Sequence, residues 1–270
     1  MSKLGGLTAF TAEAALWVTG AALIAGAAGM HWNFDPQAEI GKLTGSQSSP
    51  AATAGPSHSP DGSLRPGASP TISPTVPKYM AFVAAPGFQV RVKFTNHMTS
   101  TLNGTTTEMD QNGTGSYKGG NSTDSHRETI NGTVNTYDYI NVGDTMYESK
   151  NSGAWAKSAM PASARAWARL IYAPTMMFVD QGVETKNGAQ LHRLEVADAV
   201  AFSGTVIQTT QGATAAVMNY TVWVADDGTP VDFKVDGWVQ TTLSGVSTKS
   251  TMVQEFRIIA TSGVTITAPI

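Results

Sequence analysis

The histidines are the first residues to test for chemistry, because an imidazole can act as a general base or as a metal ligand. The five stand at His31, His58, His97, His126 and His192. None of them has a second histidine or a carboxylate at a recognised ligand spacing. His192 lies in a run where apolar and polar residues alternate, so we expect a residue that is packed in a strand or exposed on one. The sequence therefore predicts no metal site.

Signatures of covalent catalysis and of nucleotide binding are also missing. The chain has no G-x-S-x-G, H-E-x-x-H or phosphate-binding Walker sequence. The run from Gly113 to Lys118 starts like a dinucleotide-binding glycine loop, but Lys118 stands where the third glycine belongs. No cysteine is present, which excludes disulfides, thiolate metal sites and cysteine nucleophiles. We therefore expect a protein that is not an enzyme and has neither catalytic residues nor a cofactor.

Charge and composition exclude a further class of function. The net charge is −3 and the isoelectric point is about 5.9, so the dense basic patches of nucleic-acid-binding proteins are missing. Charged residues make up 14% of the chain, against roughly 25% in ordinary soluble domains. Ser, Thr, Asn and Gly take their place, as is common in exported β-proteins. We expect no nucleic-acid partner.

The N-terminal residues 1–31 contain a hydrophobic stretch. The 17 positions from Ala14 to Met30 carry no charge, which is near the lower limit of about 17 for a membrane-spanning helix. One interpretation is a cleaved signal peptide with an A-x-A site at residues 25–27, and the other is an uncleaved membrane anchor. Residues 24–26 also resemble the start of a bacterial lipobox, but Ala27 stands where the lipidated cysteine would be.

A spacer follows at residues 32–77. Between Thr44 and Pro77 it consists mainly of Pro, Ser, Gly, Ala and Thr, and such a composition cannot bury enough apolar surface to fold. Proline-rich chains are extended and semi-stiff, so the spacer is suited to hold a domain away from a membrane. We expect an extracytoplasmic bacterial protein, secreted or anchored at the cell envelope through its N-terminal segment, with a folded domain at residues 78–270.

The folded domain is predicted to be mostly β-sheet. Residues 88, 90, 92 and 94 are apolar and alternate with polar ones, a period of two that is typical of a half-buried strand in an antiparallel sheet. Asn-Gly and Asp-Gly pairs, which favour hairpin turns, recur at 103–104, 112–113, 131–132, 187–188, 227–228 and 236–237. Further strand-like runs occupy 108–117, 125–130, 134–141, 145–150, 190–196, 217–225, 231–239 and 252–260. The pattern predicts an antiparallel meander of nine or more strands.

Two segments are expected to be helical. Residues 78–85 form a predicted short helix that ends at Pro86-Gly87. Residues 161–172 lack alternation, and Pro161 suits the first turn of a helix. Trp167, Leu170 and Ile171 share one face of this second helix. It interrupts the predicted meander about midway along the domain.

Three local sequences resemble a known group of folds. Tyr139–Ser149 leads into Gly153-Ala154-Trp155, Gly182–Val196 follows the second helix, and Tyr220–Val235 is a strand, an Asp-Gly turn and a returning strand. In this order they resemble the LolA/LppX-like superfamily of bacterial lipoprotein carriers, of the LppX/LprG type, over roughly residues 78–270. The resemblance implies an α+β fold: a curved, mostly antiparallel half-barrel sheet of about nine to eleven strands, with one or two helices on its concave side.

In that superfamily an apolar cavity between sheet and helices holds acyl chains, and members are anchored through a lipidated cysteine that this chain lacks. The resemblance therefore implies a non-catalytic cell-envelope protein that binds a lipid or another hydrophobic molecule as a carrier, chaperone or sensor. The alternative is a surface-exposed interaction or structural domain with a packed core and no ligand.

Residues expected to line the cavity are apolar or aromatic and lie on the predicted strands, on the second helix or just after it. Among them the Met176-Met177-Phe178 run is the strongest candidate, because methionine adapts to irregular apolar ligands. The expected lining consists of Phe94, Met98, Tyr139, Met146, Tyr147, Trp167, Ile171, Met176, Met177, Phe178, Trp223 and Phe233.

Overall fold

The computed structural model describes residues 73–102, 105–160, 162–210, 212–243 and 246–269. The predicted signal peptide or anchor, the spacer up to residue 72 and the turn expected at 103–104 lie outside this part of the chain. Within it, strand β1 (Gln89–Leu102) shows the alternation that the sequence predicts, since every second side chain from Val90 to Leu102 is buried. One face of the strand therefore packs inward and the other meets solvent.

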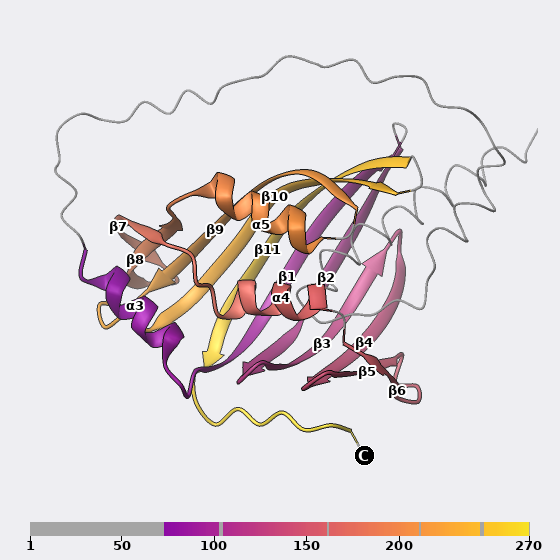
Figure 1. Cartoon of the computed structure of the whole chain (residues 1–270), viewed down its shortest axis with the longest axis horizontal. Helices are drawn as coiled ribbons and strands as arrows, with labels where there is room; N and C mark the ends of the chain where they lie inside the picture. The colour runs from indigo at the N-terminus through magenta and orange to yellow at the C-terminus, as the bar shows by residue number, and fades with distance from the viewer. Residues whose placement is uncertain (1–72, 103–104, 161, 211, 244–245, 270) are drawn as a thin grey trace, which may run out of the picture.

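The strands form one open, curved, antiparallel sheet (Figure 1). Its eleven strands lie in the order β6-β5-β4-β3-β2-β1-β11-β10-β9-β8-β7. Strands β1 to β6 follow one another on one side and β7 to β11 on the other, and the pairing of β1 with β11 joins the two series. We call them the first wing (β1–β6) and the second wing (β7–β11). The bounds are β1 Gln89–Leu102, β2 Thr105–Lys118, β3 Asn121–Ile130, β4 Thr133–Val142, β5 Thr145–Lys150, β6 Ala156–Ala159, β7 Phe178–Lys186, β8 Ala189–Val196, β9 Ala213–Val224, β10 Pro230–Leu243 and β11 Val246–Ala260.

Helix α4 (Ala162–Tyr172) has to cross the sheet, because it connects β6 to β7 and these are the two opposite edge strands. Its C-terminal end packs on the second wing. The Tyr220 hydroxyl donates a hydrogen bond to the carbonyl oxygen of Ile171 at 2.8 Å. The Tyr172 ring meets Phe233 and Phe256 edge-on, at centroid distances of 6.3 and 6.1 Å. The helix therefore lies over the inner, concave face (Figure 1).

Two other helices cover the second wing. Helix α5 (Ala199–Thr209) begins at Asp198, whose carboxylate accepts a hydrogen bond from the Ala201 amide at 2.8 Å and so caps the first turn. The Ser203 hydroxyl then accepts a hydrogen bond from the Met218 amide of β9 at 2.9 Å. Helix α3 (Thr75–Ala84) packs Tyr79 edge-on against Phe178 at 5.4 Å. It begins three residues before the helix predicted at 78–85, and α5 was not predicted.

Several predicted turns are confirmed. Asn131 and Asn187 have φ angles of 48° and 52°, and the glycines after them have 80° and 81°. Two consecutive positive φ angles are the signature of the tight turn that hairpins prefer. These pairs connect β3 to β4 and β7 to β8. The 227–228 pair lies in the turn between β9 and β10.

Two predicted turns are wrong, because their glycines lie inside strands. Gly113 is in β2 and Gly237 is in β10. A Cβ on Gly237 would lie 2.0 Å from the carbonyl oxygen of Val217, so the neighbouring strand approaches too closely for a side chain. The glycine serves close backbone approach here and not chain reversal.

The predicted fold class is confirmed: the described chain is a mostly antiparallel, open and curved sheet, with helices on its concave side. Two strands are added to the nine predicted runs, β6 and β7. Of the helices in the described residues, none has the length and apolarity that crossing a membrane requires.

Candidate functional site

The buried side chains of the inner face form rows that run across the strands, because residues paired in an antiparallel sheet share a face. The first is an aromatic row. Phe233 and Phe256 stack with centroids 4.2 Å apart, and Phe256 lies 5.9 Å from Phe94. Beyond Phe94 come His126 at 6.1 Å and then Tyr137, 5.5 Å from His126. The row thus extends from β10 in the second wing to β4 in the first.

Gly113 makes the aromatic row continuous across β2. It is paired with Phe94 on one side and with His126 on the other. A Cβ at this position would lie 2.3 Å from the carbonyl oxygen of Ser125 and 2.6 Å from the Cβ of His126. The missing side chain therefore lets the Phe94 and His126 rings meet.

A methionine row lies four residues further along the strands. Met218, Met252, Met98 and Met109 come from β9, β11, β1 and β2, and Gly237 of β10 stands between the first two. All four thioethers are buried, with exposed fractions of 0 to 3%. Methionine side chains are flexible and polarisable, so this row supplies an adaptable apolar floor.

A polar row separates the aromatic row from the methionine row. Gln254, Asn96, Gln111 and Glu128 are paired in that order across β11, β1, β2 and β3. Each is at most 5% exposed. The Asn96 amide donates to Gln111 Oε1 at 3.2 Å, and the Gln111 amide donates to Glu128 Oε2 at 2.9 Å. Burying such a row is costly unless its hydrogen-bonding groups are paired.

An acid–histidine pair adjoins the polar row. The Asp124 carboxylate and the His126 imidazole hydrogen-bond to each other, and their side chains are 7% and 0% exposed. Burial alone lowers the pKa of His126, but the charges of Asp124, Glu128 and Asp138 leave it raised above 6.5. Burial raises the pKa of Glu128 above 4.5, against the opposing effects of Gln111, His126 and Lys150.

A groove opens where α3 and α4 meet the ends of β1 and β2. Its volume is about 590 Å³, within the 300–1,000 Å³ range of small-molecule sites. Burial raises the pKa of the Tyr117 hydroxyl in the wall of this groove, and the positive charge of Arg169 opposes that shift. The groove, which we call the α3–α4 groove, is lined by Met80, Val83, Ala84, Ala85, Pro86, Phe88, Tyr117, Gly119, Gly120, Arg165, Arg169, Ala173, Pro174 and Thr175.

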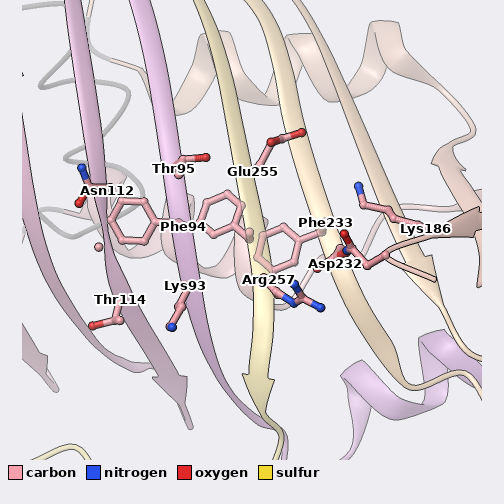
Figure 2. A pocket seen from close by; sticks show the side chains of 13 residues that line it. Lys93, Phe94, Thr95, Asn112, Thr114, Lys186, Asp232, Phe233, Glu255 and Arg257 are labelled. Atoms are coloured by element: carbon pink, nitrogen blue, oxygen red, sulfur yellow. The ribbon is translucent and has the colours of Figure 1, made fainter. Parts of the chain in front are cut away.

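The outer face of the sheet carries a polar groove of about 670 Å³. Figure 2 shows its residues, which include three cationic side chains, Lys93, Lys186 and Arg257, and two acidic ones, Asp232 and Glu255. Burial raises the pKa of Asp232, although Lys186 and Arg257 act against this shift. A groove in which charges of both signs alternate is a poor environment for an apolar ligand.

The β7–β8 hairpin forms one wall of this outer groove. Asn187 at its turn donates a hydrogen bond to Asp232 at 2.8 Å. The Lys186 ammonium lies 3.1 Å from the centroid of the Trp223 ring, whose nitrogen donates to Glu184. Trp223 is therefore buried on the outer face, beneath the hairpin.

The structure brings seven of the twelve predicted cavity residues into one buried cluster. Met176 is half-buried against that cluster. Met177 is 79% exposed, and Tyr147 faces outward beneath Lys157. Trp167 belongs to α4, but its side chain lies outside the described residues. The seven are Phe94, Met98, Tyr139, Met146, Ile171, Phe178 and Phe233.

Sequence reasoning missed the buried polar residues of the inner face. Asn96, Gln111 and Glu128 are polar, so they were left out of the expected lining, although their place in alternating strands assigns them to the inner face. Arg165 and Arg169 lie in the helix predicted at 161–172 but were not among the expected site residues. The alternation itself was the available signal, since it continues through polar positions.

The comparisons with known proteins return structures only. No protein-family model matches the chain, and no curated protein matches it either. Among solved structures, the chain is similar to lipoprotein LppX from Mycobacterium tuberculosis, with 12% identity over 68% of this chain and 94% of that one, at a TM-score of 0.37.

Two further solved structures are similar to the chain. LprF from Mycobacterium bovis shares 15% identity over 72% of this chain and 97% of its own, at a TM-score of 0.36. A LolA superfamily protein from Nitrosomonas europaea shares 12% identity over 66% of this chain and 89% of its own, at a TM-score of 0.24.

Proposed function

We propose that this chain is a non-catalytic protein that binds a lipid or another amphipathic molecule, and that the apolar part of the ligand lies in the α3–α4 groove. The observation that carries the proposal is the groove itself. It joins about 590 Å³ of space, walled mainly by apolar side chains, to two arginines. Each methylene group buried there contributes about 0.8 kcal/mol, so a single acyl chain supplies enough free energy for stable binding.

The arginines indicate an anionic headgroup. Arg165 pairs with Asp144 at 2.5 Å, but the two side chains are 48% and 86% exposed. Such an exposed pair contributes little free energy, so a ligand phosphate or carboxylate can replace Asp144. Arg169 is exposed one turn further along the same helix. Guanidinium groups bind these anions through two parallel hydrogen bonds.

The proposed setting is the bacterial cell envelope. In this interpretation the hydrophobic residues 1–31 direct export or anchor the chain, and the proline-rich spacer places the domain at a distance from the membrane. A groove that opens to the surface lets a lipid enter and leave without unfolding of the sheet. That behaviour suits a carrier or a sensor of envelope lipids.

A second candidate function is an interaction domain without a ligand. It is favoured by one observation, the tight packing where α3 and α4 meet the second wing. The enclosed space among Tyr79, Tyr172 and Tyr220 has a volume of only about 10 Å³. An interior so completely filled accepts no acyl chain without rearrangement, so this candidate predicts a ligand-free protein.

Native mass spectrometry of the full-length protein, gently purified from its own host, separates the two candidates. A co-purifying lipid is expected, and an empty protein would favour the interaction domain. Incubation with phosphatidylglycerol vesicles and with phosphatidylcholine vesicles then tests the headgroup. Arg169→Glu is expected to reduce uptake of the anionic lipid alone.

Two tryptophan variants of α3 test the location of the ligand. Ala84→Trp places an indole in the groove, so we expect lipid uptake to be lost. Ala81→Trp is the matched control, since Ala81 is exposed on the same helix and outside the groove. Equal lipid uptake by both variants would exclude the α3–α4 groove as the site.

A further inference from the structure

The outer groove is open to solvent and large enough for a small molecule. Its volume is about 670 Å³, within the range of roughly 300–1,000 Å³ that such sites have. Strands β2, β1, β11 and β10 form its floor, and the turn of the β7–β8 hairpin forms one wall. Most of its polar side chains are exposed, so a ligand can reach them without any change in the sheet.

Among the described residues, none of the five charged side chains around this groove forms an ion pair. The hairpin engages two of them by other contacts. The Lys186 ammonium lies on the Trp223 ring, and Asp232, only 4% exposed, accepts the hydrogen bond of Asn187. The three that remain are exposed, and they are Lys93, Glu255 and Arg257.

Lys93 and Arg257 form a like-charge pair. They are opposite each other in the pairing of β1 with β11, where side chains on one face have Cβ atoms about 4.5–5.5 Å apart. Two cations so placed repel each other. On its other side Lys93 is opposite Thr114, which is neutral, and Arg257 is opposite Asp232, which the hairpin already engages. An anion between the two cations removes the repulsion, and a guanidinium binds phosphate or carboxylate groups through two parallel hydrogen bonds.

Glu255 places a negative charge beside this pair. It precedes Arg257 by two residues on β11 and faces the same side, so the two Cα atoms are about 7 Å apart. Its opposite residue on β10 is Lys234, which pairs with Asp236 at 3.3 Å. Figure 2 shows Glu255, Arg257 and Lys93 together on the central strands of the floor. The groove therefore offers two cations and one carboxylate side by side.

We propose that the outer groove binds a small zwitterion, with its phosphate or carboxylate group between Lys93 and Arg257 and its ammonium group at Glu255. An anion alone is repelled by Glu255, and an amine alone is repelled by the two cations. A ligand with both charges meets an opposite charge at each end. The hydroxyl groups of Thr95 and Thr114 line the same groove and can donate further hydrogen bonds to the anionic end. This site shares no residue with the α3–α4 groove, so it is independent of lipid binding there.

The test is calorimetric titration of the full-length protein with phosphoethanolamine and with γ-aminobutyrate. Inorganic phosphate and ethanolamine are the probes that carry a single kind of charge. We expect a zwitterion to bind at millimolar concentration or below, about 5-fold more tightly than either of these probes. Added salt should weaken this binding, because the groove is exposed.

Vesicles of phosphatidylcholine with and without phosphatidylethanolamine distinguish a lipid headgroup from a free ligand. A headgroup ligand attaches the protein to the vesicles that contain phosphatidylethanolamine, and Lys93→Met should abolish this attachment. Binding of the free or the lipid-linked zwitterion supports the proposal, and binding of neither overturns it.

Two variants test the location of the ligand. Lys93 and Glu255 are exposed, so their substitution should not disturb folding. Lys93→Met is expected to weaken binding of phosphoethanolamine about 5- to 10-fold, as loss of one charged hydrogen bond does. Glu255→Gln is expected to abolish the preference for phosphoethanolamine over inorganic phosphate. Lys249→Met is the matched control, exposed on β11 and outside the groove, and should bind as the parent does.

Three results would overturn the proposal. The first is inorganic phosphate that binds the parent protein as tightly as phosphoethanolamine does. The second is binding that Lys93→Met or Glu255→Gln leaves unchanged. The third is a loss of binding in Lys249→Met as large as that in Lys93→Met, which would indicate attraction to the whole face and not to the groove.

Discussion

The two wings of the sheet share one architecture and differ in what they bury. Beneath helices α3 and α5 the inner face of the second wing is mainly apolar, and its rings pack closely, such as Tyr220 of β9 and Phe233 of β10, stacked 5.9 Å apart. Its buried polar residues include Thr248, Ser250 and Gln254 of β11, the strand that joins the first wing. The inner face of the first wing buries Asp124, His126, Glu128 and Gln111. Apolar burial stabilises a fold, whereas buried polar groups lower stability unless they are satisfied. The comparison indicates that apolar burial in the second wing contributes more to the stability of the domain than the mixed interior of the first wing does.

The largest expected effect is in the second wing. Phe233→Ala should lower the free energy of unfolding by about 3–5 kcal/mol, because it removes a ring that stacks on both Phe256 and Tyr220. Tyr137→Phe in the first wing should be neutral or slightly stabilising, since it deletes only an unpartnered buried hydroxyl. Urea unfolding measures both. The comparison between the wings breaks down if Tyr137→Phe costs as much as Phe233→Ala.

A smaller loss of stability is expected at Gly113, where the aromatic row crosses β2. Gly113→Ala places a methyl group against the Ser125 carbonyl and the His126 side chain, so it should lower stability by about 1–3 kcal/mol. Gly87→Ala is the control, because nothing lies within 4 Å of a Cβ there. Loss of stability should coincide with a changed NMR signal of the His126 ring. Equal stability of the two variants would show that β2 and β3 can separate without cost.

The smallest effect expected is a dependence on pH that comes from the first wing. The folded-state pKa values of Glu128 and His126 are both raised, so each group binds its proton more tightly in the folded state. Their contribution is present at low pH and is lost as pH rises through the folded pKa values. The free energy of unfolding should therefore decline as the pH is raised from 4.5 to above 6.5.

Glu128→Gln sharpens that measurement. The amide cannot ionise, so the part of the pH dependence due to Glu128 should vanish, and the slope of stability against pH should become shallower. Urea midpoints across the pH range measure the slope. A slope that stays the same in this variant would show that Glu128 does not titrate in the folded state.

The sequence predicted the sheet better than it predicted the site. Alternation identified the start of β1, but the predicted strand ended at Phe94 because the next inward residue is Asn96. The polar inward positions that shortened the prediction are the ones that form the polar row. Helix α5 was missed because its run of valine, phenylalanine and threonine has no strong helical preference, and the Asp198 cap was its only signal.

The rows could not be predicted because they depend on register between distant segments. Phe94 meets Phe256, and Asn96 meets Gln254, across about 160 positions of sequence. No local pattern specifies which residues of β1 and β11 are opposite each other. The Gly113 and Gly237 positions show the same limit, since a glycine that favours a turn locally serves close packing in the finished sheet.

The pairing of β1 with β11 has a consequence for the order in which the chain acquires structure. Each wing is a series of hairpins that can form from neighbouring residues, but the two wings join only when residues 246–260 meet residues 89–102. Contacts so distant in sequence slow folding. During synthesis one edge of the first wing, strand β1, remains unpaired until β11 has been made. An unpaired strand edge is a template for pairing with another chain, so the first wing is prone to aggregation until β11 has formed.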